Sequence, residues 1–324
     1  MVRAMNLLVT VIVTVYKRTE YLHQAIQSAL EQTFSSFEII VTDDSCSDAI
    51  KGIVNSFQRP EIRYRQNPIT YGVALNLRAA INEARGKYIA VLNDDDMWEP
   101  TFLEKLVAPL EADTNRVLAF SDHWIMSEDG QIDVQRTNNN TIHYGRNLLL
   151  KGAVSNLDHI VLEKNGVPLA MAAVFRKDAL NLDLLVKEVS GAYDFWISCV
   201  FAASGRPGYY IAERLTRYRV HDAMETARKS PDKNENMLFI YKKLIELNFF
   251  PEMTSLLIRR HAQALYTVGK DNLLFDHVGT AREHFLKSFM VCKSSKAIVG
   301  MIVSYIPKKL RVIYNFTLRV GMKN

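Results

Sequence analysis

The sequence predicts an α/β protein with a mostly parallel central sheet flanked by helices, followed by an all-helical C-terminal region. Three observations predict this fold class. Short β-rich runs alternate with helical patterns through the first 120 residues, which is typical of βαβ units. Polar residues directly follow several of the predicted strands. From about residue 226 onward the apolar periodicity is helical throughout.

The elements of the first 121 residues follow from local patterns. Leu22, Ile26, Ala29 and Leu30 share one face of the first predicted helix, and Gly86 terminates the third. In chain order we expect strand 7–16, helix 20–32, strand 37–42, helix 48–57, strand 62–65, helix 72–84, strand 88–92, helix 101–110 and strand 117–121.

The next segment, residues 128–166, is polar, rich in Asn and Gly and weakly periodic, which predicts a long loop that acts as a lid or a binding loop. Beyond it we expect strand 169–175, helix 194–203, strand 214–220, and helices 236–247, 254–268, 273–290 and 297–306.

Charge is distributed unevenly along the chain. Residues 1–225 carry 23 Lys/Arg and 28 Asp/Glu, a net −5, whereas residues 226–324 carry 17 and 7, a net +10. The basic end predicts an acidic partner, either an anionic membrane surface or nucleic acid. A solvated Lys-rich helical surface explains the same charge.

Cellular setting is indicated by composition. Cys46, Cys199 and Cys292 are widely spaced and in no metal-like pattern, which fits a reduced, cytoplasmic environment. No apolar run reaches the roughly 18 to 20 residues needed to span a bilayer. The apolar N-terminal run is short and lacks a cleavage site, so we expect a buried strand there and no signal peptide.

An acidic stretch follows the strand predicted at 88–92. Asn93 is followed by three carboxylates, Asp94, Asp95 and Asp96. Because adjacent carboxylates repel one another, a fold that gathers them needs a compensating positive charge, most simply Mg²⁺ or Mn²⁺ with oxygen ligands. A solvated turn that ends the strand explains the same residues.

Other strand ends are also polar: Tyr16 ends the first strand, and Asp43 and Asp44 follow the second. In an open parallel sheet, ligands bind at the carboxyl ends of the strands. We therefore expect Tyr16, the Asp pair and the acidic stretch to share one rim, which favours a binding site.

These pieces resemble the nucleotide-sugar-binding half of glycosyltransferase family 2 enzymes, which have the GT-A fold. The resemblance covers roughly residues 7–225. Its motifs are Thr10 to Tyr16, Ile39 to Ser45, Gly72 and Asn76, Ala84 to Ile89, Leu92 to Pro100, Tyr193 to Trp196 and Tyr218 to His221.

The resemblance implies a nucleotide-sugar-binding half at 1–120 and an acceptor half at 121–225. The helical periodicity and the positive charge predict a basic helical C-terminal region at 226–324. It implies metal-dependent, inverting transfer from a nucleoside-diphosphate sugar, with UDP as the expected nucleotide. The acceptor would be a hydroxyl of a saccharide or lipid-linked saccharide in surface polysaccharide synthesis. No nucleic-acid partner is expected. An anionic membrane surface is the remaining partner for residues 226–324, which would place the enzyme in the cytoplasm, peripheral on the inner face of the membrane.

Roles for individual residues also come from the resemblance. The nucleotide-binding positions are Thr14, Tyr16, Asp43, Asp44, Asn76 and Asp94. Asp95 and His221 correspond to the ligands of Mn²⁺ or Mg²⁺, and Arg219 and Arg217 to donors for the diphosphate. Asp194 corresponds to the general base, with Glu188 in reserve. Asp194 as the N-cap of the following helix is the structural alternative.

Two positions depart from the family pattern. Asn93 stands where many members have the first Asp of the metal motif, and an amide brings no charge to a cation. Gly191, Ala192 and Tyr193 precede Asp194, where many members carry an acidic pair. A sugar nucleotidyltransferase and a catalytically inactive nucleotide-sugar-binding protein are the rival functions. The first usually has a Gly-rich loop after strand 1, which this chain lacks.

Overall fold

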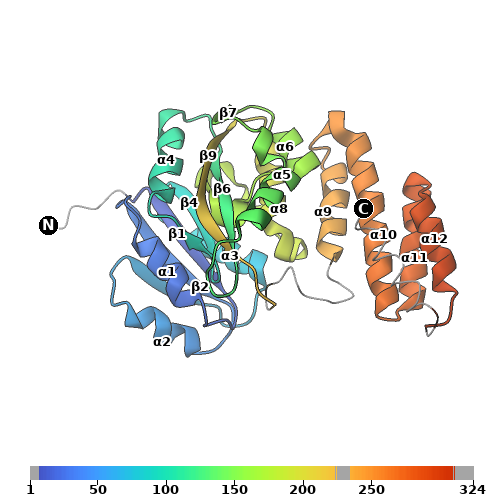
Figure 1. Ribbon diagram of the computed structural model, residues 1–324, viewed down its shortest axis with the longest axis horizontal. Coiled ribbons are helices and arrows are strands. Elements are labelled where there is room, and N and C mark those ends of the chain that lie inside the picture. The colour runs from blue at the N-terminus through green and yellow to red at the C-terminus, as the bar shows by residue number, and fades with distance from the viewer. Residues whose placement is uncertain (1–6, 223, 225–233, 309, 311–324) are drawn as a thin grey trace. The chain divides into compact units, whose positions relative to one another are not determined.

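The computed structural model describes residues 7–222, 224, 234–308 and 310. The chain divides into two compact units, Met1–Met224 and Glu225–Asn324 (Figure 1). The first unit is a sheet with helices on both faces, and the second is helical. The predicted fold class is therefore confirmed.

The sheet of the first unit has the order β3-β2-β1-β4-β8-β6-β9-β5, with β7 paired to β9. Its strands are β1 (Val9–Val15), β2 (Phe37–Asp43), β3 (Ile62–Gln66), β4 (Tyr88–Asn93), β5 (Met97–Trp98), β6 (Leu118–Met126), β7 (Gly152–Val154), β8 (Ala173–Arg176) and β9 (Gly208–Arg219). The strands β1 to β4 are parallel. Register pairs Val15 with Asp43 and Thr14 with Asn93, so the ends of β1, β2 and β4 lie side by side.

Helices cover both faces, so the residues of the central strands are buried on both sides. The odd-numbered residues of β1 pack in one core cluster with α1 (Leu22–Leu30), α2 (Ala49–Ser56) and α4 (Phe102–Ala112). Alternate residues point to opposite faces of a strand. Thr42 hydrogen-bonds Asn76 of α3 (Val73–Glu83), which places α3 on the other face.

The segment predicted as a loop at 128–166 is structured, and this prediction was wrong. It contains α5 (Val134–His143), β7 and α6 (Leu157–Lys164). The strand predicted at 169–175 is also wrong in its first half, since Leu169–Ala172 is the short helix α7 and only β8 is extended. β6 continues past the predicted end at Ser121, so Asp122 and His123 lie inside a strand and are buried.

The second unit consists of α9 (Glu235–Glu246), α10 (Thr254–Leu274), α11 (Val278–Cys292) and α12 (Ser295–Ser304). Phe285 of α11 is buried against Gly269 of α10 and Gly300 of α12. A Cβ on either glycine would lie within 2.8 Å of the Phe285 ring, so close helix packing needs glycine at both positions. In the described part of the chain, no helix combines the length and the apolar character that crossing a membrane requires.

Candidate active site

The acidic stretch forms a tight turn between β4 and the two-residue strand β5. The exposed fractions of Asp94, Asp95 and Asp96 are 2%, 7% and 0%, so the solvated-turn explanation does not hold. Burial raises the pKa of Asp94 to about 7 and raises the pKa of Asp96 well above its usual range. A fold that buries three carboxylates this closely must supply compensating charge and hydrogen bonds.

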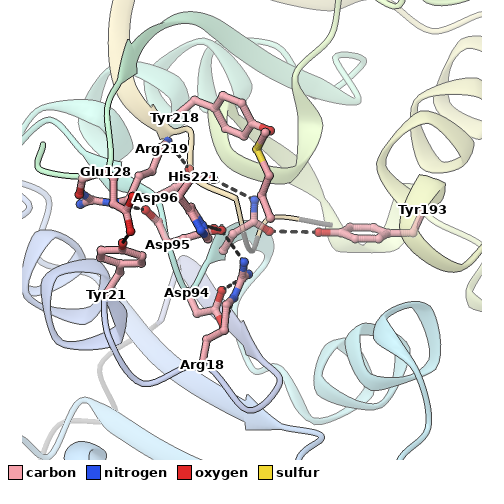
Figure 2. A network of polar contacts seen from close by, with 12 residues as sticks. Arg18, Tyr21, Asp94, Asp95, Asp96, Glu128, Tyr193, Tyr218, Arg219 and His221 are labelled. Carbon is pink, nitrogen blue, oxygen red and sulfur yellow. Dashed lines mark hydrogen bonds and ion pairs between the residues drawn. The ribbon is translucent and has the colours of Figure 1, made fainter. Parts of the chain in front are cut away.

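Two basic side chains contact Asp94 and Asp95, the first two carboxylates of this cluster (Figure 2). Arg18, in the loop after β1, donates from Nε and Nη2 to Asp94 and places Nη1 2.7 Å from Asp95 Oδ2. His221 Nε2 lies 3.1 Å from that same Asp95 oxygen. The sequence singled out His221 but missed Arg18. The available signal was a basic residue immediately past a strand end on a rim crowded with acids.

Asp96 is fully buried and holds the backbone of Arg219 through a hydrogen bond. One of its oxygens accepts from Arg219 N at 3.0 Å, and the other accepts from Asn93 Nδ2 at 2.8 Å. The first contact fastens the end of β9 to the turn, which is what brings His221 to Asp95. Asn93 therefore contributes to the site as the hydrogen-bond donor that holds Asp96.

The two arginines predicted to contact the diphosphate already have partners. Arg219 is 1% exposed, and its guanidinium donates to Asp95 O at 3.0 Å, Glu128 O at 2.7 Å and Gln24 Oε1 at 2.7 Å. Arg217 makes a salt bridge with Glu99 at 2.7 Å. The diphosphate role of both residues stays a prediction.

The residues predicted to bind the nucleotide fall into two groups. Some hold neighbouring loops through hydrogen bonds, and others lie at the ends of the strands. Both oxygens of Asp44 are used, because they accept from Tyr71 N and Gly72 N at 2.8 Å each. Asp43 accepts from Ser45 N at 2.8 Å and Tyr64 Oη at 2.7 Å.

Asn76 is buried in a polar network with Thr42 and Asn67. Thr14 is 8% exposed at the end of β1. Tyr16 is 48% exposed at the rim, with Lys17 Nζ 5.0 Å from its ring centroid.

The predicted general base, Asp194, lies in the first turn of α8 (Tyr193–Ala203), where Ala192 takes the N-cap position. Its Oδ1 accepts from Phe195 N at 2.7 Å, and burial raises the pKa of its carboxyl. The reserve residue, Glu188, is exposed. Tyr193 Oη lies 3.4 Å from Asn93 Oδ1, which ties the start of α8 to the end of β4.

Tyr193, the residue before Asp194, lies near the acid cluster. Burial raises the pKa of Tyr193 well above its ordinary value, and the negative charges of Asp194, Asp96, Asp95 and Asp94 raise it further. One tyrosine thus interacts with carboxylates of the turn after β4 and with the neighbouring carboxylate of α8. Ser190 just before α8 has a φ of 39° and a ψ of −127°, an unfavourable backbone conformation of the kind found near functional sites.

A family model described as glycosyl transferase family 2 matches residues 10–181, more than half of the 324 residues. The chain belongs to this family. The predicted resemblance is confirmed, and the protein is a family 2 glycosyltransferase with the GT-A fold rather than a sugar nucleotidyltransferase.

Relatives and solved structures agree with this assignment. The Escherichia coli β-1,3-glucosyltransferase WfaP, which acts from UDP-Glc on α-D-GlcNAc-diphosphoundecaprenol, is 28% identical over 184 residues, covering 56% of this chain and 72% of that protein.

The structure of Staphylococcus aureus TarS 1–349 in complex with UDP aligns over 92% of this chain and 89% of its own, with 14% identity and a TM-score of 0.63. The Pyrobaculum calidifontis mannosyltransferase in complex with GDP-Man and Mn²⁺ aligns over 90% and 77%, with 15% identity and a TM-score of 0.55.

The donor set of the transferase fits a divalent cation. Two adjacent ligands of an octahedral ion, each about 2.1 Å from it, lie about 3.0 Å apart. Asp95 Oδ2 and His221 Nε2 are separated by 3.1 Å. Within the described residues, no group of three or more His, Cys, Asp or Glu gathers as a metal site. Phosphate oxygens and water would therefore complete the shell, as in other sites that bind a cation together with a nucleotide.

Proposed function

We propose that the transferase is metal-dependent and inverting, and that it moves a sugar from a UDP-sugar to a hydroxyl of a saccharide or lipid-linked saccharide in surface polysaccharide synthesis. The contact of Asp95 Oδ2 with His221 Nε2, beside the ends of β1, β2 and β4, carries this proposal. The UDP complex of TarS and the UDP-Glc donor and lipid-linked acceptor of WfaP support the nucleotide and the acceptor class.

Asp95 and His221 would hold the cation at the donor side. A bound cation neutralises charge that develops on the diphosphate leaving group. Because His221 offers nitrogen and Mg²⁺ prefers oxygen ligands, we expect Mn²⁺ to be favoured over Mg²⁺. Tyr16 is exposed at the rim and offers its ring to the base. Asp94 is the carboxylate next to the metal ligand and is proposed to accept from the ribose.

At the acceptor side, Asp194 is proposed as the general base. Burial raises the pKa of this carboxyl, which strengthens it as a proton acceptor relative to an ordinary Asp. As the acceptor oxygen bonds to C1 of the sugar, the C1–O bond to the diphosphate breaks and the hydroxyl proton passes to Asp194. A single displacement of this kind inverts the anomeric configuration. The contact of Tyr193 with Asn93 would keep Asp194 in place opposite the leaving group.

The test is UDP release from a panel of UDP-sugars by the full chain, with Mn²⁺ and with EDTA, on saccharide and lipid-linked acceptors. We expect turnover with Mn²⁺, loss of turnover with EDTA or in Asp95→Ala, and an inverted anomeric centre by NMR. Asp183→Ala is the matched control, because Asp183 is 87% exposed and pairs with Arg78.

Full turnover in EDTA, or an active Asp95→Ala, would contradict metal dependence. Donor binding without turnover on any acceptor would favour the catalytically inactive alternative.

An anionic membrane surface is the partner we propose for the second unit. α12 exposes Ile298, Val299 and Ile302, and Tyr305 is exposed at its C-cap. The adjoining helix α11 exposes Leu286, Met290 and Val291. Residues 293–324 contain seven Lys/Arg and no Asp/Glu. An apolar helix face flanked by lysines suits the interface of an anionic bilayer, and would hold the enzyme peripherally on the cytoplasmic face of the membrane.

Co-sedimentation with vesicles of phosphatidylglycerol and phosphatidylcholine tests this partner. We expect binding that weakens as salt rises, and about tenfold weaker partitioning of Ile302→Asp. Ile142→Asp is the control, because Ile142 in the first unit is 62% exposed and Ile302 is 61% exposed. Equal partitioning of both variants would refute the α12 surface.

A further inference from the structure

Arg18 is the basic side chain that reaches the acid cluster from the loop after β1. The chain turns there because Lys17 adopts a left-handed φ of 62°, and Arg18 N donates to Tyr16 O at 2.8 Å. The side chain of Arg18 is 32% exposed, whereas those of Asp94 and Asp95 are 2% and 10% exposed. The guanidinium therefore has access both to the buried carboxylates and to solvent at the rim.

Three groups meet at one oxygen atom. Asp95 Oδ2 accepts from Arg18 Nη1 at 2.7 Å and lies 3.1 Å from His221 Nε2 (Figure 2). A cation held between Asp95 Oδ2 and His221 Nε2 would share this oxygen with the guanidinium of Arg18. A guanidinium and a divalent cation only a few ångströms apart repel strongly, because solvent screens such a partly buried pair poorly. The cation and the guanidinium therefore compete for the charge of Asp95.

The remaining contacts of Arg18 would hold its guanidinium at the rim if a cation bound Asp95. Nε and Nη2 both donate to Asp94, with Nε 3.3 Å from Oδ2. Release of Nη1 alone therefore frees one donor edge while the side chain stays fastened to the rim. A planar guanidinium with a free edge is well suited to phosphate oxygens.

We propose that Arg18 is an internal counter-ion that competes with the divalent cation for Asp95 in the nucleotide-free transferase, and that its freed edge binds the diphosphate when the donor enters. The inference rests on the proposed function, because it requires a cation at Asp95. Its consequence is cooperative binding. The cation alone binds weakly, whereas nucleotide removes the competitor, and by linkage each ligand raises the affinity of the other.

The experiment measures Mn²⁺ binding to the full chain by electron paramagnetic resonance, with and without UDP, for wild type, Arg18→Gln and Lys17→Gln. Lys17→Gln is the matched control, because this substitution removes one positive charge at the neighbouring, exposed position. We expect Arg18→Gln to bind Mn²⁺ alone at least about tenfold more tightly than wild type, and UDP to increase its Mn²⁺ affinity by a smaller factor. Lys17→Gln should change Mn²⁺ affinity by less than about threefold.

Equal Mn²⁺ affinity of Arg18→Gln and wild type overturns the competition. An undiminished effect of UDP in Arg18→Gln overturns the transfer of the guanidinium to the diphosphate. Asp95→Asn separates these failures from failure of the proposed function: if it binds Mn²⁺ as wild type does, the cation is not held at Asp95 at all. Arg18→Lys, which keeps the charge but not the planar fork, is the second variant, and its Mn²⁺ affinity should lie between wild type and Arg18→Gln.

Discussion

Replacing Arg219 with Met distinguishes two roles for this residue. The family resemblance predicts that it binds the diphosphate, whereas its contacts indicate a structural role. Arg219 is 1% exposed, its guanidinium lies 4.4 Å from the Tyr21 ring centroid, and it donates to two backbone carbonyls and to Gln24. Methionine fills a similar volume but leaves these acceptors without their donor. If Arg219 binds the diphosphate, the substitution should weaken nucleotide binding. If it is a buried structural residue, the substitution should lower the stability of the protein.

The magnitude follows from the lost contacts. Hydrogen bonds to charged groups contribute about 1.5 to 3 kcal/mol each, and part of the loss is recovered by burying an apolar side chain. We expect the free energy of unfolding to fall by about 3 kcal/mol. For a unit of this size that lowers Tm by about 6 to 12 °C.

The assay is thermal unfolding of the full chain followed by tryptophan fluorescence. Trp98, Trp124 and Trp196 are the three tryptophans of the chain and all lie in the first unit. Arg217→Met is the control on the same strand. Arg217 forms a salt bridge with Glu99, and the exposed fractions of the two side chains are 37% and 25%. Such partly exposed pairs contribute about 0 to 1 kcal/mol to stability. Unchanged Tm of Arg219→Met together with weaker UDP binding would refute the structural role and restore the sequence-based one.

Two further predictions concern catalysis and stability. Asp194→Asn should lower kcat by at least about a hundredfold while UDP affinity stays within about twofold, measured by single-turnover kinetics and calorimetry. Because burial raises the pKa of Asp194, activity of the wild type should fall on acidification at a higher pH than an ordinary Asp base would give. Burial and the charge of Arg146 lower the pKa of His123 to about 3, from 6.5 in the unfolded chain, so the folded state holds it neutral. The neutral His123 contributes fully to the free energy of unfolding above pH 6.5, and this contribution is lost as the pH falls toward 3. Between pH 7.5 and pH 5 the free energy of unfolding should fall by about 2 kcal/mol from this residue. Urea unfolding at both pH values should show a smaller loss for His123→Gln, and an equal loss would contradict this account.

The elements of residues 1–120 could be predicted because they carry their own signals. The strands β1, β2 and β4 are buried on both faces and are therefore rich in apolar and β-branched residues along their whole length. Parallel strands end at one edge, so the shared rim of Tyr16, Asp43 and the acidic stretch followed from topology alone.

Residues 121–225 could not all be predicted in the same way, because polar contacts hold part of this segment together. Only Thr137 of α5 is buried, so the helix shows no apolar stripe. It is fastened by Asp133, which caps it, and by Thr141, which donates to Asp122. Asp122 is itself buried in β6 because Arg146, 24 residues further along, pairs with it at 2.7 Å. A local pattern contains no information about such distant partners.

The same limit explains why the basic side chain that pairs with Asp94 and Asp95, Arg18, was missing from the sequence-based prediction. Arg217, Arg219 and His221 alternate along the chain at a spacing that favours one shared task, yet each meets a different environment. Arg217 lies beside Glu99 and Arg219 beneath the turn, while His221 follows the strand end at Asp95. Because Asp96 fixes the backbone at Arg219, the arginine side chain is directed under the acidic turn rather than over it. The guanidinium with access to both carboxylates and solvent comes instead from Arg18, 76 residues before Asp94.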